Sequence, residues 1–324
     1  MNHPLPVSPF VVPQAPRLDP AKFRDPAVTA GGEARARVGL KALTTLWFNT
    51  GTLCNLACLN CYIDSTPTND ALAYLTADEA RGFLDEIAAL GLATREIGFT
   101  GGEPFMNPGI LAMLGEALDR GFAVLVLTNA MKPMALRRDG LLALKAAHGD
   151  RLTLRVSLDH WTAAVHEAER GAGTWARAVE GLVWLADNGF SIAVAGRRLV
   201  EEAEADARAG YGRLFTELGV AIEPGDPARL VLFPEMDPEQ DVPEITTACW
   251  DILHRSPDEV MCAGSRMVVK RRGAARPTVV ACTLIPYDEG FDLGPSLAGA
   301  LGEVALNHPH CARFCVLGGA SCSA

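Results

Sequence analysis

The sequence lacks several features that would mark other classes of protein. It has no run of about 18 apolar residues, so no membrane span is expected. Its N-terminus lacks the basic start and apolar stretch of a secretory signal, which predicts a cytoplasmic protein. The net charge of −10 argues against the basic surface that duplex nucleic acid requires. With 324 residues and 49% hydrophobic content, the chain is long and apolar enough for a large buried core.

Cysteine is absent from a long central stretch, since none of the nine lies between Cys61 and Cys249. Three cysteines crowd into positions 54–61, and six lie between 249 and 322. This number is small for a disulfide-dense scaffold in so long a chain. In a reducing cytosol, clustered cysteines more often bind a metal or take part in catalysis.

Apolar strand-like stretches alternate with amphipathic helix-like stretches from residue 43 onward. Strands are predicted at 43–50, 96–100, 123–129, 152–159, 190–196 and 228–236, and helices at 76–91, 108–119, 134–147, 174–187 and 201–218. Buried strands separated by such helices indicate an α/β fold with a parallel sheet. Periodicity alone fits a partial barrel and an open doubly wound sheet equally well.

The alternation ends after Asp237. The remaining residues contain proline, glycine and six cysteines, with a β-hairpin predicted over 268–282 and a short helix near 295–306. Such a loop-rich segment needs a metal or another staple to hold its shape. The chain is therefore divided into an extended, proline-containing N-terminal arm (1–42), a core (43–237) and a small cysteine-rich C-terminal extension (238–324).

The most specific pattern is Cys54-x3-Cys58-x2-Cys61, in the loop after the first predicted strand. Three thiolates at this spacing can hold three irons of a [4Fe–4S] cluster and leave the fourth iron open to a small molecule. A structural zinc site normally takes four ligands, and the nearest histidines in the sequence are His3 and His148. Buried free thiols are the third interpretation.

A second motif, Thr100-Gly101-Gly102-Glu103-Pro104, closes the second predicted strand. The two glycines permit a turn and the close approach of a ligand to the backbone. Alone, this motif is more typical of an ordinary strand-end turn than of a binding site. The cysteine motif after the first strand and Gly-Gly-Glu-Pro after the second together resemble the radical S-adenosylmethionine (SAM) superfamily, over residues 43–236.

The resemblance implies a partial (β/α)6 barrel in which SAM binds the open iron through its amino and carboxylate groups. Glu103 would meet the methionine amine. Reduction of the cluster then cleaves SAM to methionine and a 5′-deoxyadenosyl radical, which abstracts hydrogen from a substrate. The electron implies a reductant such as flavodoxin or ferredoxin. The substrate is an unidentified peptide or small molecule, and no substrate-contacting catalytic residue is assigned.

Other residues match the family more loosely as SAM-binding candidates. They follow the third cysteine or the C-terminal ends of predicted strands, where barrels carry their chemistry, and are Tyr62, Asn129, Ser157, Asp159, Arg197 and Arg198. A turn cap or a solvated charge explains each of them as well. The family often has an aromatic residue directly before the third cysteine. Here that position is Asn60, and Tyr62 follows the cysteine instead.

The C-terminal cysteines resemble the SPASM or Twitch extensions of radical SAM enzymes, which implies one auxiliary [4Fe–4S] cluster. Its ligands are expected to be Cys262 and Cys282 with two of Cys311, Cys315 and Cys322. A structural zinc site on the same cysteines is the alternative, in which His308 and His310 are further ligands. These two histidines are expected to be exposed, and Cys249 to be a buried thiol.

These patterns favour a radical SAM enzyme over two alternatives. A non-catalytic iron–sulfur protein for electron transfer or sensing would keep the cysteines but would not need Gly101-Gly102-Glu103. A zinc-stapled binding module would need neither iron nor SAM.

Overall fold

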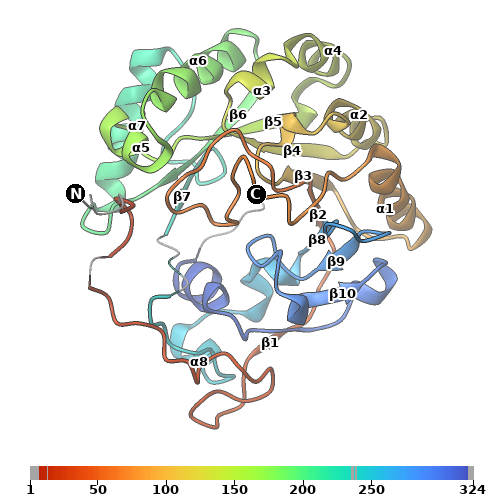
Figure 1. The fold of residues 1–324 in the computed structure, drawn as a ribbon, viewed down its shortest axis with the longest axis vertical. Coiled ribbons are helices and arrows are strands. Elements are labelled where there is room, and N and C mark those ends of the chain that lie inside the picture. Colours follow the sequence, from red (N-terminus) through yellow and green to blue (C-terminus); the bar gives the residue numbers. More distant parts are fainter. Residues whose placement is uncertain (1–6, 13, 235–236, 238, 320–324) are drawn as a thin grey trace.

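A computed structural model describes residues 7–12, 14–234, 237 and 239–319 (Figure 1). Its main feature is a nine-stranded sheet in the order β10-β9-β8-β2-β3-β4-β5-β6-β7. The strands are β2 (Thr45–Asn49), β3 (Glu96–Thr100), β4 (Ala123–Thr128), β5 (Leu152–Ser157), β6 (Ser191–Arg197), β7 (Leu230–Phe233), β8 (Ser265–Val269), β9 (Thr278–Val280) and β10 (Asp292–Gly294). A separate pair joins β1 (Arg37–Val38) to β11 (Val304–Ala305).

The six strands β2 to β7 are parallel and lie side by side in the order of the sequence. A doubly wound sheet would instead reverse its strand order at a switch point. The helices are α1 (Ala77–Ala89), α2 (Ile110–Asp119), α3 (Lys132–Ala135), α4 (Arg138–His148), α5 (Ala163–Arg170), α6 (Thr174–Asp187), α7 (Glu204–Leu218) and α8 (Cys249–Leu253). Helices α1 to α7 follow the outer side of the arc of strands in Figure 1. The predicted partial (β/α)6 barrel is thus confirmed.

Two hydrophobic cores lie on opposite faces of the sheet because successive side chains of a strand alternate. Leu46 and Phe48 of β2 pack with the outer helices, whereas Trp47 between them packs with the C-terminal segments. Gly98 of β3 lies beside Trp47, and a Cβ at this position would overlap the indole ring. The glycine in mid-strand therefore makes room for a large side chain inside the barrel.

The C-terminal extension continues the sheet of the core. Strand β8 pairs parallel to β2, with Thr45 opposite Ser265, although more than 200 residues separate them in the sequence. The predicted hairpin is confirmed, because β8 and β9 are antiparallel with Val269 opposite Thr278. The pairing of β8 with β2 was not predicted, since the choice of a distant partner depends on the tertiary fold.

Local signals set several boundaries correctly. Thr76 and Glu79 form the expected capping box at the start of α1, and Gly91 follows its end with a φ of +62°. The predicted helix at 134–147 is split into α3 and α4. The helix expected near 295–306 is wrong. A short 3-10 turn and β11 replace it, because Gly299 and Gly302 disfavour a continuous helix.

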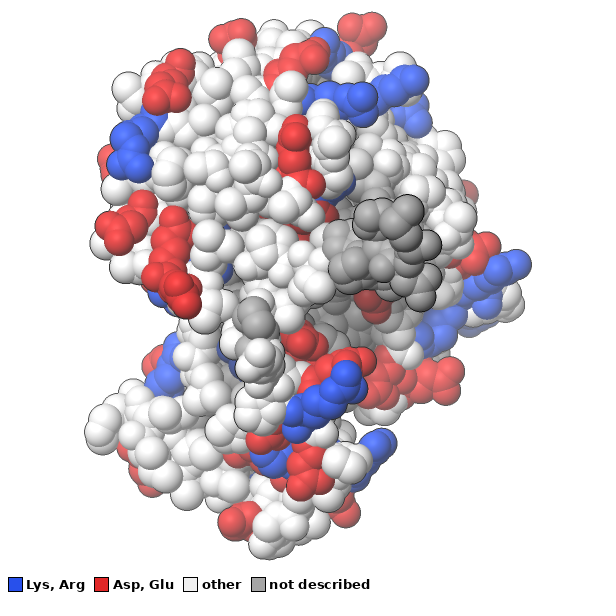
Figure 2. Space-filling view, turned by 60° about the vertical axis from the view of Figure 1, so that its left-hand side comes forward, with Lys and Arg blue, Asp and Glu red and all other residues white. Residues whose placement is uncertain are grey.

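The described part of the arm, 7–12 and 14–42, contains no helix and packs against both other segments. Leu18 N donates to Glu239 O, and the buried Arg35 forms an ion pair with Glu244. On the face drawn in Figure 2, Lys and Arg are interspersed with Asp and Glu among the described residues. No helix in the described ranges combines the length and the apolar character needed to cross a bilayer.

Candidate active site

One cavity collects most of the predicted site residues. It lies where the parallel strands end, and strands β3 to β7 each contribute to its lining at or near their C-terminal ends. Of the predicted residues it is lined by Cys54, Cys58, Cys61, Tyr62, Gly101, Gly102, Asn129, Ser157, Asp159 and Arg197. Glu103 and Arg198 do not line it.

Gly101 and Gly102 hold the cysteine loop, which carries Cys54, Cys58 and Cys61, against the end of β3. Gly101 has a φ of +137°, which favours glycine, and a Cβ there would lie 2.5 Å from Gly51 O. A Cβ on Gly102 would overlap Leu53 O. The backbone is pinned at the same place, since Gly102 N donates to Gly51 O at 2.9 Å. The close approach expected of a ligand is therefore made by the protein's own backbone, directly before Cys54.

We expect Gly102→Ala to displace the loop before Cys54, because the added methyl group has no space beside Leu53 O. Overpacking of this kind costs about 1–3 kcal/mol of stability. The thermal unfolding midpoint and the bound iron should fall together. Gly82→Ala is the matched control, since a Cβ on Gly82 of α1 meets no atom within 4 Å. Equal iron and equal midpoints for Gly102→Ala and wild type would contradict this role.

Glu103 lies beneath the cavity rather than in its wall, with only 1% of its surface exposed. Its carboxylate accepts hydrogen bonds from Thr128 Oγ1 at 2.9 Å, Asn129 N at 2.8 Å and Phe105 N at 3.2 Å. Burial raises the pKa of Glu103 to about 7, and these donated bonds oppose the rise. Through these bonds Glu103 supports the end of β4, where Asn129 lines the cavity, and its role toward the methionine amine stays a prediction.

The replacement Glu103→Gln should destabilise the protein. An amide has only one acceptor oxygen, so its NH2 group would face one of the N–H groups that now donate to Glu103. A mismatched buried polar group costs about 1–3 kcal/mol. Urea denaturation of the anaerobic proteins measures this difference, and an unchanged free energy of unfolding would contradict the arrangement.

A buried ionic cluster borders the cavity. The carboxylate of Asp159 accepts two bonds from Arg170, at 2.6 Å from Nε and 3.0 Å from Nη2, and lies 3.5 Å from Arg197 Nε. Although burial pushes the pKa of Asp159 upward, the two guanidinium groups hold it at about 2. Asp159 is therefore ionised at neutral pH, and Arg170, which also lines the cavity, carries a positive charge close to Cys58.

The sequence analysis missed Arg170 and its neighbour Glu169, which form the last turn of α5. The carboxylate of Glu169 accepts hydrogen bonds from Asn60 N at 2.8 Å and Ser8 Oγ at 2.6 Å, and its carbonyl accepts from Leu59 N. This turn thus fixes the cysteine loop. A helix over these residues was signalled by AAVHEAER followed by Gly171, a typical C-terminal stop.

The two consecutive arginines at the end of β6 point in different directions, because alternate side chains of a strand point to opposite faces. Arg197 is buried and donates to Asn60 O at 2.6 Å, with its guanidinium 4.2 Å from the centre of the Tyr62 ring. Arg198 is exposed and donates to Glu202 O at 3.3 Å, outside the cavity. Tyr62 lines the cavity and Asn60 does not.

A second cavity lies in the C-terminal extension and brings four cysteines together. It is lined by Cys262, Cys282, Cys311 and Cys315, which come from three separate segments. Cys322 lies outside the described residues. Cys249 is half-buried, does not line this cavity and accepts a bond from Thr246 N at 3.4 Å.

The expected exposure of the two histidines is wrong. His310 is 7% exposed and lines the second cavity, and His308 is half-buried beside it. Their ring centres lie 4.7 Å apart. In the described part of the chain, no three His, Cys, Asp or Glu side chains converge on a position for a single metal ion. We therefore group the cysteines by the cavity that they line.

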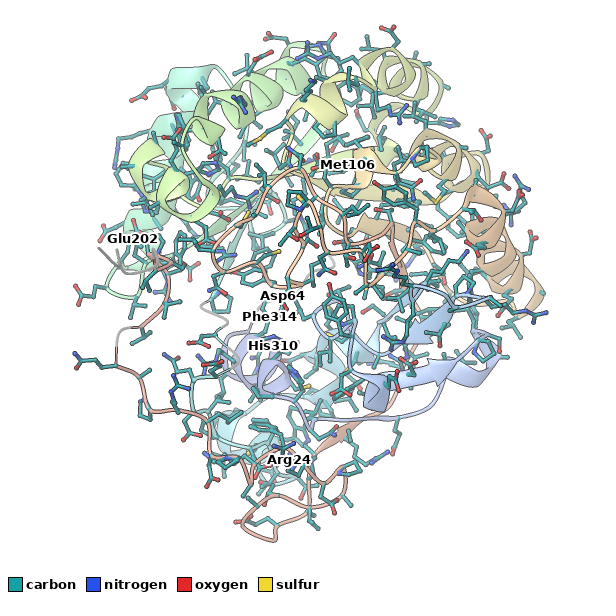
Figure 3. All side chains as sticks on the ribbon, viewed as in Figure 1. Arg24, Asp64, Met106, Glu202, His310 and Phe314 are labelled. Carbon is teal, nitrogen blue, oxygen red and sulfur yellow. The ribbon has the colours of Figure 1, made fainter. Side chains whose placement is uncertain are left out.

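The C-terminal π-helix (Cys311–Leu317) stands between the two cavities. Cys311 and Cys315 line the second cavity, whereas Phe314 lines the first. Figure 3 labels Phe314 on this segment and His310 directly before it, and Asp64 lies above both in that view. One short element thus contributes to both sites, and π-helical turns are frequent at functional sites.

Comparison with known proteins agrees with this geometry. Residues 48–205 match the sequence profile of the Radical SAM superfamily. This part of the chain is a radical SAM domain. Among solved structures, Streptococcus suis SuiB bound to S-adenosylmethionine has the same fold, with a TM-score of 0.56 at 12% identity over 78% of this chain and 63% of SuiB.

Two curated relatives match a part of this chain. The Bacillus subtilis protein AlbA, of antilisterial bacteriocin subtilosin biosynthesis, is 32% identical over 143 residues, which are 44% of this chain and 30% of AlbA. The AdoMet-dependent heme synthase of Methanosarcina barkeri is 34% identical over 132 residues, which are 40% of this chain and 35% of that protein. The chain thus spans about a third of the length of these relatives.

Radical SAM proteins use a [4Fe–4S] cluster and SAM, and the first cavity suits both. Burial raises the pKa of Cys54 to about 12 and that of Cys58 to about 11. Such thiols become thiolates only beside a strong positive charge, which iron supplies. Three sulfur donors at one cavity wall are the donor set that a cluster with one open iron needs.

Proposed function

We propose that this protein binds a [4Fe–4S] cluster on Cys54, Cys58 and Cys61 and uses it to cleave SAM. The observation that supports this most directly is the shared cavity. The three cysteines line it together with Gly101, Gly102 and the polar ends of the neighbouring strands. An electron-transfer protein has no need for a cavity with these polar groups beside its cluster.

The bound cluster would supply the electron that splits SAM into methionine and a 5′-deoxyadenosyl radical, which takes a hydrogen atom from the substrate. The chain's own residues would bind and orient SAM. Asn129 and Ser157 present polar groups at the strand ends, and Tyr62 offers a ring for the adenine. Arg170 and Asp159 fix charges of both signs beside them, which suits a ligand that carries an amine, a carboxylate and a sulfonium.

We further propose one auxiliary [4Fe–4S] cluster on the four cysteines of the second cavity. Four thiolates complete the coordination of such a cluster, so it would have no open iron. Residues 1–42, 43–237 and 238–324 would then act as arm, radical SAM core and cluster-binding extension. A cytoplasmic flavodoxin or ferredoxin is the proposed reductant.

The proposed substrate is either a peptide or a small molecule. AlbA is named for the biosynthesis of a bacteriocin, and the relative from Methanosarcina barkeri for the synthesis of heme. Both match less than half of this chain. Their names therefore do not decide what this chain acts on.

The test is electron paramagnetic resonance of the reduced, anaerobically reconstituted protein. Addition of SAM should change the signal of the first cluster, because SAM would bind to its open iron. The same addition should leave the signal of the auxiliary cluster unchanged. A spectrum that is insensitive to SAM would favour the electron-transfer or sensing alternative, and zinc in place of iron would favour the binding module.

A further inference from the structure

The first cavity has two walls of different chemistry. The cysteines and the charged groups Asp159, Arg170 and Arg197 belong to the cysteine loop and to the region of β5, α5 and β6. Another part of the lining is apolar and includes Phe233, Leu284 and Phe314. Among the described lining residues, these three come from the end of β7, the segment after β9 and the π-helix.

The two phenylalanines of the apolar wall form a chain of ring contacts with Tyr62. The ring centres of Phe233 and Phe314 lie 5.4 Å apart, and Phe233 meets the edge of Tyr62 at 5.9 Å. Phe314 is fully buried and Phe233 half-buried. Rings at these separations form favourable pairs and present a rigid face to a ligand.

This wall lies outside the part of the chain that the superfamily shares. The family profile ends at residue 205, before Phe233, Leu284 and Phe314. The residues that would hold the cluster and SAM all lie within the profile. A surface that belongs to the cavity but not to the shared machinery is the natural place for substrate selection.

We propose, as an extension of the function above, that Phe233, Leu284 and Phe314 receive an uncharged apolar group of the substrate. This group would be an aromatic ring or a branched aliphatic chain. An anionic group at this wall would lose its hydration without gaining a partner, and a cationic group would meet Arg197, whose guanidinium already lies over the Tyr62 ring, so that the binding of either is disfavoured. Phe314 is the specificity-determining residue, because the π-helix places it between the two cavities.

The preference of the cavity for uncharged apolar groups is measured by isothermal titration calorimetry. The reconstituted holoprotein is used with SAM and without reductant. The probes are the N-acetyl amides of phenylalanine, leucine, lysine and aspartate, with 4-ethylphenol and 3-methylbutanol as small-molecule counterparts. We expect the phenylalanine and leucine probes to bind at least about tenfold more tightly than the charged ones. Tighter binding of the amides than of their counterparts would indicate a peptide source, and the reverse a small molecule.

Phe314→Ala should reduce the preference for the phenylalanine probe over the lysine probe by about tenfold. If Phe314→Ala does not fold, Phe314→Leu and Phe233→Ala replace it. Each of these variants should bind the phenylalanine probe more weakly than wild type does. Phe122→Ala makes the same chemical change outside the cavity and should leave the preference unchanged. Equal binding of charged and apolar probes to wild type, or an unaltered preference in the folded Phe314 and Phe233 variants, overturns the proposal.

Formation of 5′-deoxyadenosine by wild type, measured separately with a strong reductant, distinguishes the two possible failures. If wild type cleaves SAM but does not discriminate between the probes, the role given to the apolar wall is wrong and the proposed function stands. If wild type does not cleave SAM with any probe present, the proposed function fails, and this inference fails with it.

Discussion

Cys58→Ala is expected to abolish 5′-deoxyadenosine formation while the chain stays folded. With two thiolates left in the first cavity, the cluster would lose one of its three protein ligands. Cys58 is half-buried in an irregular loop, so its truncation removes little packing. The assay is mass spectrometry after anaerobic reconstitution with SAM and a strong reductant.

The matched control for that variant is Cys249→Ala. Cys249 is also half-buried, but it lines neither cysteine cavity. It should therefore keep the 5′-deoxyadenosine yield of wild type. An unchanged yield in Cys58→Ala would contradict the assignment of the SAM-binding cluster, provided that circular dichroism shows both variants folded.

Cys282→Ala is expected to lose about four irons per chain, which is one cluster. Cys282 lines the second cavity with three other cysteines, and an auxiliary cluster left with three of its four protein ligands would be labile. The first cluster should persist, so the SAM-dependent change in its resonance signal should remain. Iron and sulfide analysis, with zinc measured alongside, gives the result.

Two results for Cys282→Ala would contradict an iron cluster on this residue. Equal iron in the variant and wild type would exclude Cys282 as a ligand of an iron cluster. A loss of zinc instead of iron would support the structural zinc alternative. Cys249→Ala again serves as the control, and its iron content should match that of wild type.

Features that depend on neighbours in the sequence could be predicted. The alternation of strands and helices gave the six parallel strands, and Thr76 with Glu79 marked the start of α1. The spacing of Cys54, Cys58 and Cys61 required no knowledge of the tertiary fold, because the three lie within one loop. The match to the Radical SAM superfamily confirms the family predicted from these motifs.

Features that depend on distant partners could not be predicted. The pairing of β8 with β2 joins segments that the sequence separates widely. The resemblance placed Cys262 and Cys282 in one cluster, but the sequence could not choose which two of Cys311, Cys315 and Cys322 join them. The same holds for Glu169, whose helix was overlooked although its carboxylate fixes the loop at Asn60. A local pattern contains no information about which of several cysteines will face one another.

The direction of a side chain was another limit. Glu103 belongs to a recognisable motif, but its carboxylate turns toward Thr128 and Asn129 instead of the cavity. Arg197 and Arg198 looked equivalent in the sequence, yet only Arg197 lines the cavity. In both cases the backbone geometry at the end of a strand decides which way the side chain points.

The most direct test of the account is quantification of 5′-deoxyadenosine from anaerobically reconstituted wild-type protein with SAM and a strong reductant. The arrangement of Cys54, Cys58 and Cys61 beside Gly101 and Gly102 predicts its formation, in amounts that depend on the bound cluster. Protein that carries about eight irons per chain and forms none, even with the apolar probes present, would contradict the central claim.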